Sequence, residues 1–395
     1  MKLKNILCGA LAFAAAACGG GGQQPAGGGA GQEQSRITIG VAGPMTGDLR
    51  QFGESLKNGA AMAFDEINAS GGLLGKQVDI SVGDDQANSK EAMNVARNFV
   101  GDSRKPLAVL GHFNSGSSKP AGEIYNQAGI IMLTPASTNP AVTSPERPYV
   151  FRNLPNDAQN GDMLAQFIIA DMGAKRIAIY FANNEYGKGL AEIVEKKAAA
   201  LGVTVVDKAN YDPAADEDFR PVLTKWKSAR LDAIVLAGET PKAAQLIKQA
   251  REIGLDVPFA GGDGIASSDL WTIGRDAVLG TFVVSYFHPG NPDTAVQDFV
   301  KRFKDKYGRE PDVWAAQAYD AARVLADAVK RAGTVDGAKV RDALAATDGW
   351  RGVTGPHRFK DGDAVGKRVI ITRVEAGPDG PQFGFHKEVA PESGE

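Results

Sequence analysis

Hydroxyl and acidic side chains follow several short apolar runs of the sequence, at positions where they could bind a small charged molecule. Ser115 opens an expected helix shortly after one such run, and Thr138 follows the next run. Hydroxyl groups and the free backbone N–H groups of a helix start together form a natural site for a carboxylate. Asp263 lies between glycines in the second half of the chain, where it could pair with an ammonium group. A molecule held at both groups would be a zwitterion such as an α-amino acid.

Two aromatic residues, Phe52 and Tyr186, could flank the side chain of such a zwitterion. Each candidate also has an ordinary structural explanation. Phe52 could be a core residue, and Tyr186 could pack on the start of its own helix. Residues 115–118 could form only a helix cap, and Thr138 or Asp263 could serve only a turn. The residue types alone therefore leave both interpretations open.

Strands and helices alternate regularly from Ser35 onward, which predicts the elements that must position these side chains. The expected strands cover residues 37–42, 78–82, 107–110, 130–133 and 149–151 in a first series, and 177–181, 203–206, 233–237 and 258–260 in a second. Strands that alternate with helices of about 10–15 residues indicate βαβ units and parallel sheets. Two such series predict an α/β fold with two doubly wound parallel-sheet lobes. In such sheets the binding crevice lies beyond the carboxyl ends of the strands, where the candidate residues are found.

Two helix starts carry capping signals. Asn88, with Glu91 three positions later, predicts one N-cap, and Thr240, followed by Pro241, predicts another. Glu239 precedes this second helix, so its charge could simply stabilise the helix N-terminus. After the second series the sequence predicts a strand at 281–287, helices at 294–306, 314–332 and 335–346, and a late strand at 368–374.

The composition argues against several other classes of function. The chain has 395 residues with 44 Lys and Arg against 47 Asp and Glu, a net charge of −3. This balance argues against a nucleic-acid partner, because such proteins usually carry a basic face. The 4 histidines are scattered, and both cysteines, Cys8 and Cys18, lie near the N-terminus. We therefore expect no metal, no cofactor and no disulfide in the folded body.

The first residues resemble an export signal followed by a lipid attachment site. Two lysines precede an apolar run at 6–17, which is too short to span a bilayer as a helix. The sequence Ala-Ala-Ala-Cys-Gly around Cys18 resembles a bacterial lipobox, where cleavage before the cysteine exposes its thiol for lipidation. Residues 1–17 are thus expected to be a lipoprotein signal peptide, with ordinary secretory cleavage as the alternative. The Gly-rich residues 18–35 are expected to form a flexible tether with a reach of roughly 20–24 Å.

Several segments match a known family in order and spacing. They are residues 59–60 with 65–72, 111–118, 124–125 with 129–130, 134–136, 186–191, 249–251 and 355–356. Together they resemble the branched-chain amino-acid-binding proteins of bacterial ABC importers, which have the class I periplasmic-binding-protein fold. The resemblance implies two lobes joined by three crossover segments. Lobe one would comprise residues 36–152 and 285–354, and lobe two residues 153–284 and 355–395.

The resemblance also implies a role for the candidate residues. In that family the ligand carboxylate is bound at the positions matching Ser115 and Thr138. The ammonium is bound by the carbonyl matching Ala136 and by an acid matching Asp263. The acid is usually the longer Glu, Glu239 stands where relatives carry an aromatic residue, and the disulfide of some relatives is absent. The expected ligand-binding residues are Phe52, Ser115, Ala136, Ser137, Thr138, Tyr186, Glu239 and Asp263.

The expected function is capture of a small amino acid, above all a branched-chain one, between two closing lobes and its delivery to an ABC permease. The protein would be a monomeric, extracytoplasmic lipoprotein held at a membrane of the cell envelope through Cys18. The alternatives are a sensor of the same fold that signals through a partner protein, or transport of an amide, urea or aromatic acid. An enzyme is not expected, because the glycine-rich turns at 40–43 and 71–77 fit neither the dinucleotide nor the P-loop pattern and Ser115 lacks a GxSxG elbow.

Overall fold

Two sheets of mostly parallel strands organise the described residues, which are 36–378 and 380–389 in this computed structural model. From Ser35 onward the chain forms one compact unit. The expected signal peptide, the tether and the lipidation site at Cys18 lie outside the described residues.

The first sheet has eight strands in the order β11-β12-β13-β5-β4-β3-β1-β2. Its strands are β1 (Ile37–Gly43), β2 (Val78–Asp84), β3 (Ala108–Leu110), β4 (Ile131–Thr134), β5 (Val150–Arg152), β11 (Asp348–Gly352), β12 (Gly355–Lys360) and β13 (Asp363–Ala364). The first five are parallel, and β11 and β12 add an antiparallel hairpin. β3 and β4 are buried throughout, as expected for parallel strands that are covered on both faces.

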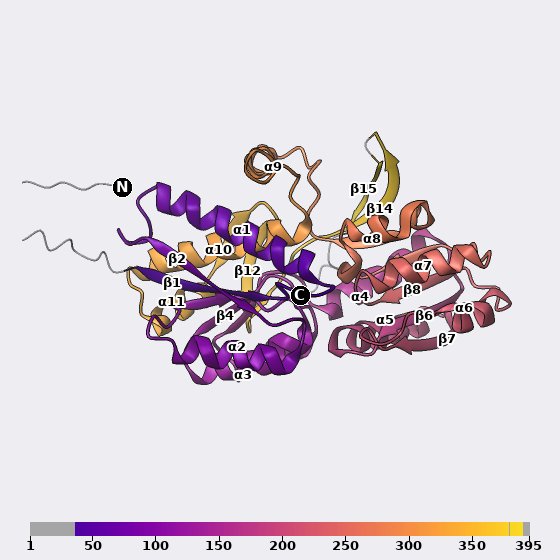
Figure 1. Cartoon of the computed structure of the whole chain (residues 1–395), viewed down its shortest axis with the longest axis horizontal. Coiled ribbons are helices and arrows are strands. Elements are labelled where there is room, and N and C mark those ends of the chain that lie inside the picture. The colour runs from indigo at the N-terminus through magenta and orange to yellow at the C-terminus, as the bar shows by residue number, and fades with distance from the viewer. Residues whose placement is uncertain (1–35, 379, 390–395) are drawn as a thin grey trace, which may run out of the picture. The chain divides into compact units, whose positions relative to one another are not determined.

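Helices cover both faces of this sheet to form lobe one. α1 and α10 pack together over one face, and α2 and α3 pack together over the other (Figure 1). The helices are α1 (Arg50–Ala69), α2 (Ser89–Gly101), α3 (Ser115–Gln127), α9 (Thr294–Tyr307), α10 (Val313–Ala332) and α11 (Gly337–Ala345), with a 3₁₀ turn η1 (Pro140–Val142). The doubly wound order β2-β1-β3-β4-β5 brings the ends of β1 and β3, and the residues that follow them, to one edge.

The second sheet has seven strands in the order β15-β14-β10-β9-β8-β6-β7 and forms the centre of lobe two. Its strands are β6 (Arg176–Ala182), β7 (Thr204–Tyr211), β8 (Ala233–Ala237), β9 (Phe259–Gly261), β10 (Phe282–Ser285), β14 (Val369–Gly377) and β15 (Gly380–Val389). β14 and β15 are antiparallel additions to five parallel strands.

The helices of lobe two again lie on both sides of its sheet. α4 packs on α5, whereas α7 packs on α6 and α8 (Figure 1). They are α4 (Asp157–Gln166), α5 (Glu185–Ala200), α6 (Arg220–Lys227), α7 (Lys242–Glu252) and α8 (Asp269–Gly274), with a π-helical turn η2 (Phe167–Asp171) and 3₁₀ turns η3 (Asp263–Ile265) and η4 (Arg275–Val278).

The chain crosses between the two sheets three times. It leaves the first sheet after β5, returns after β10, and enters the second sheet again at β14. The sheet order differs from the expected division at one place, because β12 and β13 still pair in the first sheet although residues 355–395 were expected in lobe two. The third crossing therefore lies between β13 and β14, and not at the expected lobe boundary between residues 354 and 355.

The capping signals met different outcomes. Asn88 is the N-cap of α2, and its side chain accepts hydrogen bonds from the amides of Lys90 and Glu91, as predicted. The Thr240 cap is wrong: α7 begins one residue later, with Pro241 at the N-cap position, and the hydroxyl of Thr240 has no hydrogen-bond partner. The backbone amide of Thr240 instead donates to the carbonyl of Gly264 across the sheet edge.

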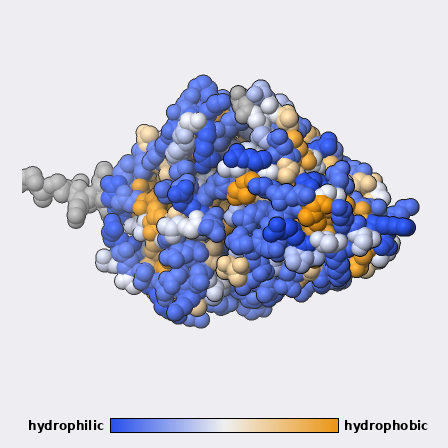
Figure 2. Space-filling model, turned by 45° about the vertical axis from the view of Figure 1, so that its right-hand side comes forward, coloured by the Kyte–Doolittle hydropathy of each residue, from blue (hydrophilic) through white to orange (hydrophobic). Residues whose placement is uncertain are grey.

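No helix in the described ranges is long and apolar enough to cross a membrane. Figure 2 shows one face of the molecule, on which hydrophilic residues predominate and hydrophobic residues form small separate patches.

Candidate functional site

The segments after five strands of the two sheets meet around a small cavity of about 20 Å³. Residues from both lobes line it, namely Phe113, Asn114, Ser115, Ala136, Thr138, Tyr186, Glu239, Asp263, Gly264 and Trp314. This volume is little more than one water molecule needs.

The lobe-one side of the cavity presents a helix start and a free hydroxyl. Ser115 is the first residue of α3, and its Oγ accepts a hydrogen bond from the amide of Asn139 at 3.2 Å. The preceding Asn114 makes no side-chain cap, so its amide group is available elsewhere. Thr138 is buried, and its Oγ1 has no hydrogen-bond partner. The arrangement offers hydroxyl and backbone N–H donors that an anionic group could accept.

A buried hydroxyl network holds this loop pair in place. The Thr134 hydroxyl donates to the carbonyl of His112 at 2.7 Å, and the Ser137 hydroxyl donates to the carbonyl of Phe113 at 2.8 Å. Ser118 and Ser137 share a further hydrogen bond of 2.6 Å. Ser137, one of the expected ligand-binding residues, thus lies behind the cavity lining and fixes the loop that carries Ala136 and Thr138.

His112 follows β3 in the sequence, and its side chain is packed inside lobe one. His112 is fully buried, with Nδ1 2.6 Å from Asp85 Oδ2 and Nε2 3.2 Å from the hydroxyl of Tyr125. Both ring nitrogens are therefore engaged within lobe one.

Asp263 provides the acidic group of lobe two. It opens the 3₁₀ turn η3 directly after β9 and is 2% exposed. The hydroxyl of Tyr186 donates to Oδ1 at 2.8 Å, and that of Tyr286 donates to Oδ2 at 3.1 Å. Burial raises the pKa of both tyrosines well above its usual value, so both stay protonated donors. Burial also raises the pKa of Asp263, so an ammonium group would stabilise its ionised form.

Asp157 is a second buried acid at this site, which the sequence does not reveal. It is the first residue of α4, its amide donates to the carbonyl of Thr138 at 2.7 Å, and neither carboxylate oxygen has a hydrogen-bond partner. Burial raises the pKa of Asp157, and the negative charge of Asp263 raises it further. In the sequence it follows Asn156, the actual N-cap, and reads as an ordinary helix start.

Glu239 lies between the two lobes. It is 6% exposed, and its carboxylate accepts hydrogen bonds from Nδ2 of Asn184 in lobe two at 3.0 and 3.2 Å. Nδ2 of Asn114 in lobe one donates to the same carboxylate at 3.3 Å. Burial raises the pKa of Glu239 to about 7. The side-chain hydrogen bonds go to two asparagines and not to the first amides of α7.

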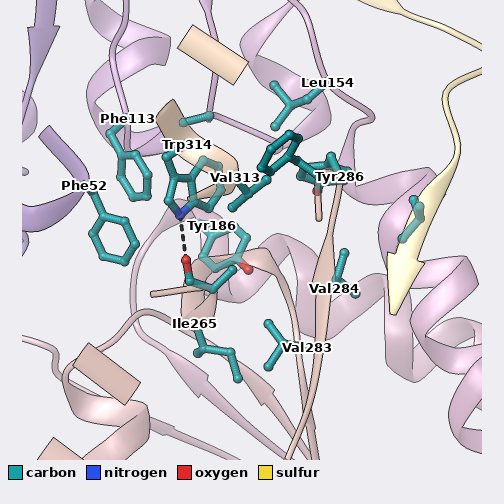
Figure 3. Packing of buried hydrophobic residues seen from close by; sticks show 14 of the residues in the cluster. Phe52, Phe113, Leu154, Tyr186, Ile265, Val283, Val284, Tyr286, Val313 and Trp314 are labelled. Atoms are coloured by element: carbon teal, nitrogen blue, oxygen red, sulfur yellow. Dashed lines mark hydrogen bonds between the residues drawn. The ribbon is translucent and has the colours of Figure 1, made fainter. Parts of the chain in front are cut away.

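Aromatic side chains form the apolar wall of the site. Phe52 stacks on Phe113 with ring centroids 4.4 Å apart, and the edge of Trp314 meets Phe113 at 4.9 Å. Phe113 and Trp314 line the cavity, whereas Phe52 supports them from the lobe-one core (Figure 3). Phe113 and Trp314 were not expected here. Trp314 is far away in the sequence and carries no local signal.

Hydrogen bonds connect the two lobes on either side of the cavity. The indole N–H of Trp314 donates to the carbonyl of Ala266 at 3.0 Å (Figure 3). The side-chain amide of Asn139 donates to the carbonyl of Glu185 at 2.8 Å. These contacts place the lobes in a closed arrangement around the cavity. In the described part of the chain no cluster of His, Cys, Asp or Glu is suited to hold a metal ion.

Comparison with known proteins identifies the family. Residues 36–379 match the family described as periplasmic binding protein. The chain belongs to the periplasmic binding protein family. The expected resemblance and the expected fold class are thereby confirmed. Proteins of this family are extracytoplasmic substrate-binding components of ABC transporters and are not enzymes.

Individual relatives share much of the chain. Leu/Ile/Val-binding protein homolog 2 of Brucella abortus is 34% identical over 357 residues, which cover 89% of this chain and 94% of that protein. A leucine-binding protein from Thermotoga maritima has a TM-score of 0.84 at 32% identity, covering 90% of this chain and 99% of that one. A branched-chain amino acid transporter substrate-binding protein from Streptococcus pneumoniae, solved with isoleucine, has a TM-score of 0.84 at 29% identity, covering 90% and 100%.

Proposed function

We propose that this protein is an extracytoplasmic solute-binding lipoprotein that captures an α-amino acid between its lobes and delivers it to an ABC importer. The observation that carries the proposal is the placement of Asp263 on one lobe and of Ser115 and Thr138 on the other, around one cavity. The relatives named for leucine, isoleucine and valine support an amino-acid ligand, and branched-chain side chains are the first class to test.

Closure gives the ligand its affinity in this mechanism. The carboxylate would first meet Ser115, Thr138 and the α3 start in lobe one. Lobe two would then bring Asp263 to the ammonium group, so the bound ligand makes contacts in the closed state that the open state lacks. Moving this equilibrium from 1:99 to 99:1 takes about 5.5 kcal/mol of differential affinity. One hydrogen bond to a charged group contributes roughly 1.5–3 kcal/mol, so contacts from both lobes are needed.

Substitution of Asp263 tests the ligand-binding proposal. We expect Asp263→Asn to weaken binding of leucine, isoleucine or valine at least tenfold in isothermal titration calorimetry, because the ammonium loses its charged partner. Asp276→Asn changes an exposed acid of the same lobe and should leave the dissociation constant unchanged. An equal effect of the two substitutions, or none from either, would remove Asp263 from the site.

The membrane anchor rests on the lipobox-like sequence around Cys18. We expect the full-length chain to incorporate a radiolabelled fatty acid in bacterial cells and to fractionate with membranes. Cys18→Ala should abolish the label and release the protein into the soluble extracytoplasmic fraction. Labelling that persists in Cys18→Ala would place any lipid elsewhere.

A further inference from the structure

Three carboxyl groups are buried around the cavity without a cationic partner. Asp157, Glu239 and Asp263 are all at least nine-tenths buried. Within the described ranges, none of the three forms an ion pair with Lys or Arg. The buried Arg152 lowers the pKa of Asp157, but its guanidinium pairs with Asp363. Burying unpaired negative charge is costly, so the arrangement is suited to a ligand that brings donors or positive charge.

Buried polar atoms without hydrogen bonds at the cavity indicate a binding site for a ligand. Thr138 Oγ1 and Asn114 Oδ1, both on residues that line the cavity, are buried without hydrogen bonds. Buried polar groups in folded proteins are nearly always hydrogen-bonded, so two unpaired ones at a single cavity point to a ligand. The proposed ammonium and carboxylate groups account for the atoms near Asp263 and Thr138. They do not account for Glu239.

Glu239 has a position and a hydrogen-bond capacity of its own. It follows β8, whereas Asp263 follows β9, so the two acids enter the cavity from neighbouring strand ends. An ionised carboxylate has about four acceptor sites. Asn184 and Asn114 supply three contacts of 3.0 to 3.3 Å, all from neutral amides. Glu239 lines the cavity and therefore retains an unused acceptor site and a negative charge that its neutral partners do not balance.

A purely structural role for Glu239 fits the geometry poorly. A helix-stabilising acid would direct its carboxylate to the first amides of α7, but only the backbone carbonyl of Glu239 contacts that helix, through the amide of Ala243 at 3.3 Å. The carboxylate instead bridges the lobes through Asn114 and Asn184. It is thus held at the boundary where a ligand side chain would lie.

We propose that Glu239 binds a hydrogen-bond donor on the side chain of the ligand, so that the site favours amino acids ending in a hydroxyl, amide or ammonium group over hydrocarbon side chains of the same shape. This inference rests on the proposed function and names its substrate class more narrowly. A hydrocarbon side chain against Glu239 leaves a buried charged acceptor facing apolar atoms, whereas a donor satisfies it. A site built to hydrogen-bond a ligand group rejects the analogue that lacks it.

Pairs of amino acids with matched shapes test this inference by calorimetry. The pairs are threonine with valine, asparagine with leucine, and ornithine with norleucine. We expect the donor-bearing member of at least one pair to bind wild-type protein at least tenfold more tightly than its hydrocarbon partner. Glu239→Gln should reduce this ratio at least threefold, and Glu239→Leu should reverse it. Glu192→Gln alters an exposed acid on α5 of the same lobe and should preserve the ratio.

The outcomes distinguish this inference from the proposed function on which it rests. Equal or tighter binding of the hydrocarbon member in every pair overturns the inference and leaves amino-acid capture intact. A preference that survives Glu239→Gln and Glu239→Leu unchanged also overturns it. Failure of every amino acid to bind overturns the proposed function and this inference together. The wild-type ratios decide the question even if one variant does not fold, which circular dichroism would show.

Discussion

At the scale of single residues, the buried acids of the site lower the stability of the ligand-free protein. Asp157 has no hydrogen bond to its carboxylate, and Asp263 and Glu239 are bonded only by neutral groups. Burial raises the pKa of each. Their folded-state pKa values exceed those of an unfolded chain, about 3.9 for Asp and 4.3 for Glu. The folded protein therefore holds protons that the unfolded chain has released.

This sets the sign of the pH dependence for the ligand-free protein. The stability contributed by these acids is fully present below about pH 4 and is lost as the pH rises through their raised pKa values. For Glu239 that loss runs from about pH 4 to about pH 7, where it is nearly complete. Lys367 has the opposite sign in a higher window, because burial lowers its pKa to about 7 and its contribution is lost as the pH falls towards that value. Single substitutions are needed to separate these groups.

Asp157→Asn isolates one of them. We expect the ligand-free variant to be more stable than the wild type at pH 8, by on the order of 1–3 kcal/mol, because an unpaired buried charge is removed. The gain should shrink towards pH 4, where the wild-type carboxyl is protonated. Urea unfolding at both pH values measures it, and Asp162→Asn, a solvent-accessible acid on the same helix, serves as the control. A variant less stable than the wild type at pH 8 would show that Asp157 has a structural partner.

At the scale of elements, the crossings between the sheets are held by a buried polar cluster. Asp320 on α10 accepts hydrogen bonds from the amides of Val353 and Thr354 at 3.0 and 2.7 Å. The Thr354 hydroxyl donates to it as well. Lys367 then donates to the carbonyl of Asn153 at 2.8 Å and to Thr354 Oγ1 at 3.1 Å. Two segments near different crossings are thus tied to the same helix.

Removal of Asp320 should loosen this connection. We expect Asp320→Ala to destabilise the protein by on the order of 3 kcal/mol, since two partly buried amides and a hydroxyl lose their buried acceptor. Asp327→Ala removes a partly exposed acid of the same helix, which pairs with Arg331, and should cost less than about 1 kcal/mol. Urea unfolding of both variants provides the comparison. Similar values for the two would mean that Asp320 is dispensable for the crossings.

The alternating parallel strands were predictable, and the added antiparallel ones were not. Runs such as Ala-Ile-Val-Leu-Ala in β8 are continuously apolar because helices cover both faces, so the sequence marks them clearly. β11 and β12 are largely exposed and short, and β13 has two residues, so periodicity gives little signal there. β12 and β13 were expected in lobe two but pair in the first sheet, where β13 lies beside β5, a strand far away in the sequence.

The candidate site also contains some residues that could be predicted from the sequence and others that could not. Residues directly after strand ends, such as Ser115, Thr138, Glu239 and Asp263, were predictable because topology gathers the ends of parallel strands. Asp157 and Trp314 reach the site from helix starts in other parts of the chain, at α4 and α10. Only the tertiary packing of the two lobes brings them there. Ser137 was expected to bind the ligand because it lies between Ala136 and Thr138. Its hydroxyl instead donates a hydrogen bond to the carbonyl of Phe113.

At the scale of the whole molecule, function depends on the difference between separated and closed lobes. The closed arrangement is supported by hydrogen bonds near the cavity, and Gln51 adds another contact, with its amide 2.9 and 2.7 Å from the hydroxyl oxygens of Ser267 and Ser268. Gln51 lies on α1 of lobe one, and the serines lie in lobe two. Such contacts stabilise the closed state whether or not they touch the ligand, and therefore they tune affinity from a distance.

Gln51→Ala tests this coupling between closure and affinity. Neutral hydrogen bonds such as those to the serines contribute about 0.5–1.5 kcal/mol each, and the Gln51 amide also lies 2.8 Å from the Asp269 carboxylate. We therefore expect ligand affinity to fall about fivefold to a hundredfold, chiefly through faster dissociation. Stopped-flow measurement of release gives the rate, and small-angle X-ray scattering should show the radius of gyration falling when wild-type protein is saturated with ligand. Lys57→Ala, an exposed position on the same helix, should change neither quantity. An unchanged release rate in Gln51→Ala, with an unchanged radius in the wild type, would mean that binding proceeds without movement of the lobes.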